Sequence, residues 1–192
     1  NAIISSDIGN NCAIGNAYPS FDEGRKYLAP GLFGPCGYGL PSIVGAKIGQ
    51  PHVPVVGFAG DGAFGIAVNE LTAIGRDEWP AVTQIVFRNY QWGAEKRNST
   101  LWFDDNFVGT ELDTKVSYAG IAQACGLLGV QVQTMDELTA VLNQAIKDQM
   151  ENNKTTVIEV ILNQELGEPF RRDAMKKPVQ VAGVTAADMA AE

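Results

Sequence analysis

The sequence predicts an α/β fold, a doubly wound parallel sheet with helices on both faces. Short uncharged runs rich in β-branched residues alternate along the chain with longer runs of helical periodicity. This alternation is typical of right-handed βαβ units, which build a parallel sheet covered on both sides. The 192 residues are enough for one ordinary domain with a proper core.

The first half of the chain contains two predicted strands and one predicted helix. Residues 2–6 (AIISS) form a short apolar run that ends in a loop at residues 7–9. Residues 27–41 are punctuated by glycine and proline and cannot be regular throughout. Residues 42–49 (SIVGAKIG) are typical of a helix whose small residues pack closely on a sheet. Residues 53–59 (VPVVGFA) are typical of a buried strand.

The second half continues the alternation. Apolar residues stand near helical spacing from Ile66 to Ile74, and Pro80 ends a predicted helix over residues 66–79. Asp136 is a candidate N-cap for a later helix with one apolar face. The remaining predicted elements are strands over residues 82–87, 130–134 and 155–162 and helices over residues 118–125 and 137–152.

The composition of the chain changes near Gln164. The residues that follow are charged, interrupted by proline and rich in alanine at the end. We expect them to wrap the surface or a partner, so we divide the chain into a domain over residues 1–164 and a C-terminal extension over residues 165–192. Because the sequence starts at Asn1, inside a strand-like run, we expect a fragment.

Charge and residue usage exclude several functional classes. A net charge of −8 argues against nucleic-acid binding, which needs a basic surface. No apolar run approaches the roughly 20 residues of a membrane span, and the N-terminus lacks a signal-peptide pattern. The widely spaced Cys12, Cys36 and Cys125 predict reduced thiols in a cytoplasmic protein. The single histidine, His52, is expected on a surface loop, which argues against a Ser-His-Asp triad.

The segment FAGDGAFG, residues 58–65, presents a problem of charge. Gly60, Gly62 and Gly65 are spaced like a loop that lets a phosphate approach the backbone, but Asp61 stands among them. A carboxylate about 4 Å from one phosphate charge costs about 1 kcal/mol in water and about 4 kcal/mol near a protein surface. Either the segment holds no phosphate, or a cation lies between the two anions.

The first alternative is a nicotinamide dinucleotide site, because GDGAFG satisfies the pattern G-x-G-x-x-G. That pattern expects an acidic residue at the end of the next strand, roughly 20 positions on. Asp77 and Glu78 have about that distance but precede Pro80, ahead of the strand. Arg88 could bind the phosphate of NADP, so an NADP-binding module stays open, although it leaves Asp61 unshielded.

The second alternative places Mg²⁺ between the carboxylate and a diphosphate. Mg²⁺ takes oxygen ligands at about 2.0–2.1 Å, usually one or two protein groups plus substrate phosphates. Asp61 would supply a carboxylate, Asn89 at the end of the next strand an amide oxygen, and Gln91 a backbone carbonyl. Backbone N–H groups at the start of the following helix would hold the diphosphate.

The spacing of GDG and the turn FRNYQWG resembles the motif of the thiamine-diphosphate-dependent enzymes, the family of acetolactate synthase and pyruvate decarboxylase. That family usually has two asparagines where this chain has Arg88-Asn89. The segment GPCGYGLP resembles the family's segment beneath the cofactor. The resemblance implies Gly34 and Cys36 backbone groups facing the aminopyrimidine, with the Cys36 side chain as a small prop for the bent cofactor. The implied metal ligands are Asp61, Asn89 and Gln91. The implied cofactor-binding residues are Gly9, Asn10, Asn11, Gly34, Cys36, Gly60, Asp61, Gly62, Ala63, Asn89, Gln91, Trp92 and Gly93.

Longer segments resemble one acetyl-transferring branch of this family. They span residues 5–21, 26–49, 87–112 and 162–179. The resemblance implies sulfoacetaldehyde and phosphate as substrates, acetyl phosphate and sulfite as products, and a homodimer or homotetramer. The family's activating glutamate lies in an N-terminal domain, so we expect no catalytic residue and no turnover in this chain by itself. A carboligase acting on 2-keto acids and a non-catalytic subunit stay open.

Both implied substrates are anions, so the site needs local cations. The candidates are two basic pairs, Lys96 with Arg97 and Arg171 with Arg172. The aromatic residues Trp92, Trp102 and Phe103 are expected to line a core or a subunit interface rather than touch substrate.

Overall fold

The structure is a computed structural model that describes residues 1–165. The predicted C-terminal extension therefore lies outside the described residues, apart from Glu165, and the boundary predicted at residue 164 stays a prediction. Within the described part, none of the helices combines the length and the hydrophobicity that crossing a bilayer requires.

A single sheet of six parallel strands forms the centre of the molecule, in the order β2-β1-β3-β4-β6-β5. Its register pairs Ile4 with Val56, Val56 with Thr83 and Ile85 with Ile158. The strands are β1 (Ile3–Ser6), β2 (Tyr27–Leu28), β3 (Val55–Gly60), β4 (Thr83–Arg88), β5 (Leu128–Val132) and β6 (Thr156–Ile161). The predicted α/β class with a parallel sheet is confirmed.

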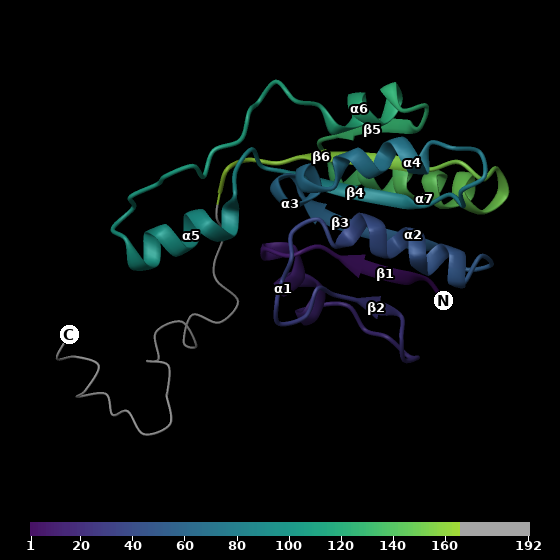
Figure 1. The fold of residues 1–192 in the computed structure, drawn as a ribbon, viewed down its shortest axis with the longest axis horizontal. Coiled ribbons are helices and arrows are strands. Elements are labelled where there is room, and N and C mark those ends of the chain that lie inside the picture. The colour runs from purple at the N-terminus through teal and green to yellow at the C-terminus, as the bar shows by residue number, and fades with distance from the viewer. Residues whose placement is uncertain (166–192) are drawn as a thin grey trace.

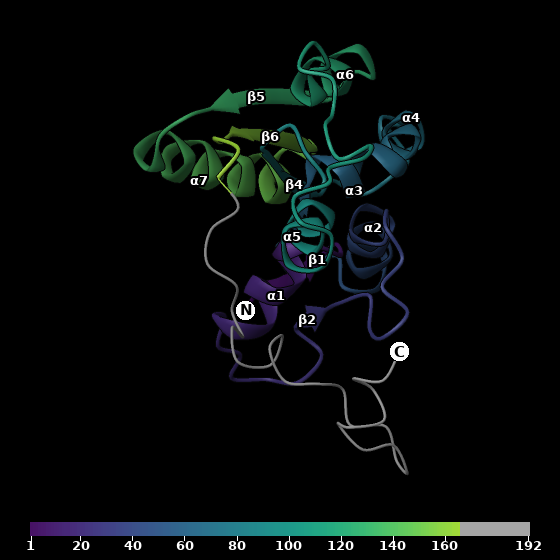
Figure 2. The ribbon, with the colours of Figure 1, turned by 90° about the vertical axis from the view of Figure 1, so that its left-hand side faces the viewer.

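Helices cover both faces of this sheet (Figures 1 and 2). Helices α2, α4 and α6 pack on one face around Ile43, Leu71 and Val82, and α7 packs on the other around Ile85 and Ile158. The helices are α1 (Asn10–Ala17), α2 (Gly39–Gly49), α3 (Asp61–Ile66), the 3₁₀ turn η1 (Val68–Glu70), α4 (Leu71–Ile74), α5 (Gly93–Trp102), α6 (Tyr118–Ala124) and α7 (Met135–Glu151). The double layer explains why five of the six residues in each of the central strands β4 and β6 are buried.

The first turn of α7 corrects one predicted cap. Thr134, not Asp136, is the N-cap: its side chain accepts from the backbone N–H of Glu137, and the Glu137 carboxylate accepts from the N–H of Thr134. This reciprocal pair satisfies two N–H groups that a helix start leaves free. Asp136 lies inside the first turn, where its negative charge favours the helix dipole.

Two further boundaries differ from the sequence-based expectation. The helix predicted over residues 66–79 is broken into the end of α3, η1 and α4, and β5 begins at Leu128 instead of residue 130. Helix α5 was not predicted, because none of its ten residues is buried and its sequence carries no apolar stripe. Figure 1 shows it projecting from the sheet, beyond the strand ends.

The glycine-rich segment after β3 is helical rather than a loop. Gly60 is extended and acts as the N-cap, and Asp61 is the first residue of α3. The helix therefore starts directly at the carboxylate.

Candidate functional site

Three helices begin at the carboxyl ends of the strands. Helix α1 begins at Asn10 just after β1, α3 at Asp61 directly after β3, and α5 at Gly93 just after β4. In parallel α/β sheets this edge is the usual place for a ligand. All but two of the cofactor residues implied by the sequence lie in or beside these three helix starts; the exceptions are Gly34 and Cys36.

The carboxylate of Asp61 is buried and fully oriented. It is 2% exposed, its Oδ1 accepts from the backbone N–H of Gly62 at 3.1 Å, and its Oδ2 accepts from that of Tyr90 at 2.7 Å. Burial raises the pKa of Asp61, although these two N–H groups and the charge of Arg88 act in the opposite direction. Among residues 1–165 no ion pair with Asp61 is present, and a buried, oriented carboxylate of this kind is suited to receive a cation.

The backbone of Asp61 is fixed as well. Its carbonyl oxygen accepts from the hydroxyl of Tyr118 at 2.8 Å. Burial, then the nearby carboxylate of Asp61, raises the pKa of Tyr118 to about 12, so the phenol stays protonated and remains a donor. Hydrogen bonds to both the carboxylate and the carbonyl oxygen therefore fix Asp61 at the start of α3.

Asn89 faces Asp61 and the carbonyl oxygen of Gln91. With its amide nitrogen turned toward them, Asn89 donates to Asp61 Oδ1 at 3.3 Å and to the Gln91 oxygen at 3.0 Å. With its amide oxygen in that position, oxygen faces two oxygens at the same separations, which is repulsive unless a cation joins them. Oxygens bound to Mg²⁺ at 2.0–2.1 Å lie about 3 Å apart as neighbours.

The donor set thus fits Mg²⁺. It combines one carboxylate, one amide and one backbone carbonyl, which can all supply hard oxygen ligands, and an octahedral ion would take its other ligands from phosphate or water. Within residues 1–165 there is no cluster of three or more His, Cys, Asp or Glu that could hold a metal by itself. A metal here would depend on bound phosphate or water for its remaining ligands.

Two glycines beside Asp61 allow side chains to approach the backbone closely. A Cβ on Gly62 would lie 2.7–2.9 Å from the indole of Trp92, and a Cβ on Gly60 would lie 3.0 Å from Nδ2 of Asn11. The structure therefore brings Trp92 and Asn11 against the start of α3.

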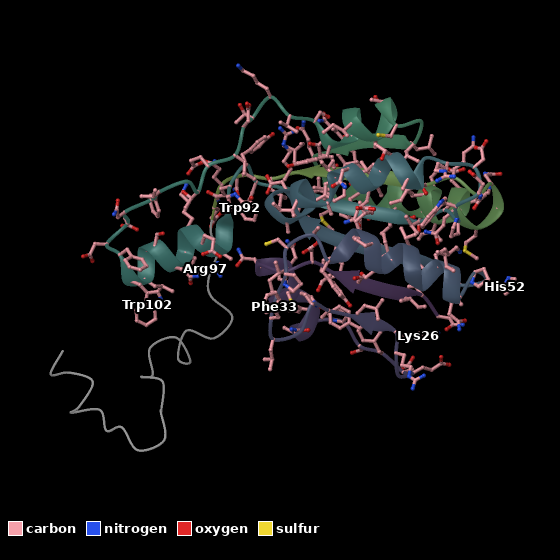
Figure 3. All side chains as sticks on the ribbon, in the orientation of Figure 1. Lys26, Phe33, His52, Trp92, Arg97 and Trp102 are labelled. Atoms are coloured by element: carbon pink, nitrogen blue, oxygen red, sulfur yellow. The ribbon has the colours of Figure 1, made fainter. Side chains whose placement is uncertain are left out.

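Gly93 brings the other two helix starts together. A Cβ at this position would lie 3.3 Å from Nδ2 of both Asn10 and Asn89. The guanidinium of Arg97, one turn into α5, donates to Oδ1 of Asn10 at 3.4 Å. Figure 3 shows Trp92 at the start of α5 and Arg97 farther along it.

The segment over residues 34–39 is held by a residue that sequence reasoning missed. Asp7 is 1% exposed; its carboxylate accepts from the N–H groups of Gly37 at 3.1 Å and Gly39 at 2.8 Å. Gly34 has φ +61, a left-handed conformation suited to glycine. Asp7 follows a strand directly, and that position was the one signal in the sequence that could have found it.

Cys36, in the middle of this segment, is exposed and reduced. Partial burial raises the pKa of its thiol, and the carboxylates of Asp7 and Glu95 add to the effect. A thiol with a raised pKa is a poor nucleophile at neutral pH. This agrees with a structural part for Cys36 rather than a catalytic one.

The candidate cation Lys96 is engaged with protein groups. Its ammonium pairs with the carboxylate of Glu111, donates to Oε1 of Gln91 at 3.0 Å and lies over the ring of Phe107. Arg171 and Arg172 lie outside the described residues.

The turn of the proposed metal ligands is fastened by two neighbouring segments. The N–H of Trp92 donates to the carbonyl of Thr110 at 2.8 Å, and the N–H of Leu112 donates to that of Tyr90 at 2.9 Å. The buried side chain of Gln91 donates to the carbonyl of Gln164 at 2.8 Å. Gln164, near the end of the described residues, therefore contacts this turn.

Other predicted residues lie away from this centre. Arg88 is buried and paired with Glu159, so it does not present a cation to a dinucleotide phosphate. Trp102 and Phe103 are 64% and 65% exposed and do not line the core; the interface alternative stays a prediction. His52 is exposed, as expected, at the opposite end of the molecule from α5 (Figure 3).

Comparison with known proteins agrees with this geometry. Residues 7–160 match the family described as thiamine pyrophosphate enzyme, C-terminal TPP binding domain. The chain is 82% identical over 188 residues to the sulfoacetaldehyde acetyltransferase of Roseovarius nubinhibens, covering 98% of the chain and 31% of that protein. The corresponding values for the sulfoacetaldehyde acetyltransferase of Rhodobacter capsulatus are 77%, 98% and 32%. The chain thus spans about a third of the length of these relatives.

The fold recurs in a solved structure of low sequence identity. Benzoylformate decarboxylase from Polynucleobacter necessarius superposes with a TM-score of 0.75 at 21% identity, over 88% of this chain and 31% of that one. At this identity the similarity shows the shared architecture alone.

Proposed function

The chain belongs to the thiamine pyrophosphate enzyme family, as its C-terminal TPP-binding domain, and on this premise we propose that it holds Mg²⁺ and thiamine diphosphate in an acetyltransferase. The proposed reaction converts sulfoacetaldehyde and inorganic phosphate to acetyl phosphate and sulfite. High identity to two sulfoacetaldehyde acetyltransferases along 98% of the chain supports the substrate. The observation that carries the metal is the convergence of three groups: the Asn89 amide lies 3.3 Å from Oδ1 of Asp61 and 3.0 Å from the carbonyl oxygen of Gln91.

In this proposal the protein's own residues bind and orient the diphosphate. Asp61, Asn89 and the Gln91 carbonyl hold the metal, and the buried carboxylate is neutralised by it. The backbone N–H of Ala63 and the amides of Asn10 and Asn11, at the starts of α3 and α1, would face the diphosphate oxygens. The N–H of Gly62 donates to Oδ1 of Asp61, so Gly62 would act mainly by orienting that carboxylate. When bound, the cofactor would supply a stabilised carbanion for chemistry at the substrate carbonyl.

The segment over residues 34–39 would orient the other end of the cofactor. The carbonyl of Gly34 and the N–H of Cys36 face the aminopyrimidine in this proposal, and Gly9 lies at the entry to α1. Asp7 supports the arrangement, because its carboxylate already fixes two N–H groups of the segment. A fixed backbone can hold a ring without reorganising when the ring binds.

Substrate anions need a cation in a chain of net charge −8. We assign this part to Arg97, which lies beside Asn10, and to Arg171 or Arg172. Lys96 is a weaker candidate because Glu111 compensates its charge. Unchanged kinetic constants for both substrates after Arg97→Ala, Arg171→Ala and Arg172→Ala would remove the assignment.

Binding and product analysis test the proposed function. Thiamine diphosphate should bind with Mg²⁺ and lose affinity when the metal is chelated, whereas NADPH should not bind. The intact enzyme should release sulfite and form acetyl phosphate from sulfoacetaldehyde and phosphate. Release of carbon dioxide from a 2-keto acid, without sulfite release, would favour a carboligase; binding of NADPH alone would favour a dinucleotide module. A homodimer or homotetramer in the cytoplasm stays a prediction, which light scattering tests for the assembly.

A further inference from the structure

Arg88 occupies a buried position next to the proposed metal ligand Asn89. It is 3% exposed, and its Nη1 donates to Oε1 of Glu159 at 2.5 Å, while Nη2 donates to the carbonyl of Thr114 at 2.9 Å. Glu159 is completely buried. The guanidinium therefore spans from β4 to the neighbouring β6 and to the chain that leads into α6.

The guanidinium also contacts two tyrosines that touch Asp61. Its central carbon lies 4.6 Å from the ring centre of Tyr90 and 5.9 Å from that of Tyr118. The N–H of Tyr90 donates to Oδ2 of Asp61, and the hydroxyl of Tyr118 donates to its carbonyl oxygen. Both of these hydrogen bonds to Asp61 thus come from residues that pack against one cation.

Glu159 anchors the other end of the pair. Its Oε2 accepts from Ser117 Oγ at 3.0 Å, from the N–H of Ala119 at 3.1 Å and from Nε2 of Gln131 at 2.9 Å. Ser117 and Ala119 flank Tyr118, the first residue of α6, so their hydrogen bonds to Glu159 fix the start of that helix. The orientation of Tyr118 is therefore set from two sides, by its helix start and by the guanidinium.

A buried ion pair is on average no more stabilising than a well-packed apolar pair of similar volume. The pair can instead fix the orientation of neighbouring side chains. A planar guanidinium donates hydrogen bonds in fixed directions and stacks on aromatic rings, which an alkyl chain cannot do. For Arg88 the hydrogen-bonded partner is the carboxylate of Glu159, and the aromatic partners are the rings of Tyr90 and Tyr118.

We propose that Arg88, anchored by Glu159, is a positioning residue that holds Tyr90 and Tyr118 so that Asp61 keeps the orientation needed for Mg²⁺. This inference rests on the proposed function, because it needs the metal to bind at Asp61. It gives a specific part to Arg88, which stands at the first of the two adjacent positions where the family usually has asparagines.

The test compares a buried and an exposed arginine–glutamate pair. The double variant Arg88→Met with Glu159→Gln removes the cation without leaving a buried charge. The control changes Arg76→Met with Glu78→Gln, an ion pair whose side chains are 60% and 67% exposed. Calorimetric titration of the intact protein with thiamine diphosphate, at a series of Mg²⁺ concentrations, gives the half-saturating Mg²⁺ concentration, and urea unfolding gives the stability.

The buried double variant should raise the half-saturating Mg²⁺ concentration about 10- to 100-fold, as for other residues that orient metal ligands, and the exposed one should leave it unchanged. A folded buried double variant with wild-type Mg²⁺ dependence overturns the inference. Wild-type protein that binds no thiamine diphosphate with Mg²⁺ overturns the proposed function itself, which is a distinct result.

Two milder variants keep the test decisive if the double variant does not fold. Arg88→Lys keeps the charge beside Glu159 but loses the planar fork, and Tyr118→Phe removes only the hydroxyl that donates to Asp61. Each should raise the half-saturating Mg²⁺ concentration by less than the double variant, with near-wild-type stability for Tyr118→Phe. Wild-type values for both would overturn the inference.

Discussion

The backbone N–H of Tyr90 donates to Oδ2 of Asp61 at 2.7 Å, across 29 positions of sequence. This bond ties the residue that begins α3 to the turn that follows β4. Because Asn89 and Gln91 flank Tyr90, it also sets the distance between the carboxylate and the other proposed metal ligands.

Asp61→Asn should abolish metal-dependent cofactor binding while the fold is retained. A ligand present at 100 times its Kd stabilises the folded state by about 2.7 kcal/mol, so Mg²⁺ with thiamine diphosphate should raise the Tm of the wild type but not of the variant. Differential scanning calorimetry with and without both ligands measures this. Asp148→Asn, the same change at a half-buried position in the last turns of α7, should keep the full rise. An undiminished rise in the Asp61 variant would exclude Asp61 as the ligand.

Gly62→Ala should destabilise the protein because its Cβ would meet the indole of Trp92 at 2.7–2.9 Å. Overpacking of this kind costs about 1–3 kcal/mol. Gly45→Ala is the matched control: Gly45 is an exposed helical glycine in α2 with no atom within 4 Å of an added Cβ. That change should stabilise by about 0.5–1 kcal/mol. Urea unfolding of both variants should therefore give shifts of opposite sign, and equal shifts would contradict the packing.

Cofactor binding should protect Cys36 from alkylation. Its thiol is exposed, but burial of part of the group and then the carboxylates of Asp7 and Glu95 raise its pKa. Iodoacetamide should react slowly at neutral pH, faster after Glu95→Gln, and much more slowly when Mg²⁺ and thiamine diphosphate are bound. Peptide mass spectrometry can follow Cys36 and Cys125 separately. Equal protection of Cys125, which lies at the end of α6, would point to a global effect instead.

Lys47 should make stability rise with pH in the alkaline range. It is 4% exposed, its ammonium donates to the carbonyl of Val53 at 2.9 Å, and burial lowers its pKa below the ordinary value of 10.5. Between the lowered folded pKa and 10.5 the unfolded chain binds more protons, so the free energy of unfolding increases with pH. Urea unfolding from about pH 8 upward should show a more positive slope in the wild type and in the exposed control Lys147→Met than in Lys47→Met. The comparison between variants isolates Lys47, because the raised pKa values of Cys36 and Tyr118 lower the free energy of unfolding with pH over the same range in all three proteins. Equal slopes in Lys47→Met and the wild type would contradict the assignment.

The sequence by itself determined the sheet class and the spacing of the metal motif. Strand-forming runs and helical periodicity are local, so β3 and β4 could be placed within one or two residues of their observed bounds. Asp61 and Asn89 follow directly on these two strands, and parallel neighbours carry such residues to the same edge of the sheet. The neighbourhood of the proposed ligands was therefore predictable.

Only the tertiary structure decided how each side chain is used. Lys96 and Arg88 read alike in sequence as available cations. In the fold Lys96 meets Glu111 and Arg88 meets Glu159, 71 positions away. The position of Asp7 directly after a predicted strand marked it as a candidate, but only the fold shows that its carboxylate accepts from the N–H groups of residues 37 and 39. Such contacts depend on strand register and helix packing, which bring distant residues within 3 Å, and no local pattern encodes them.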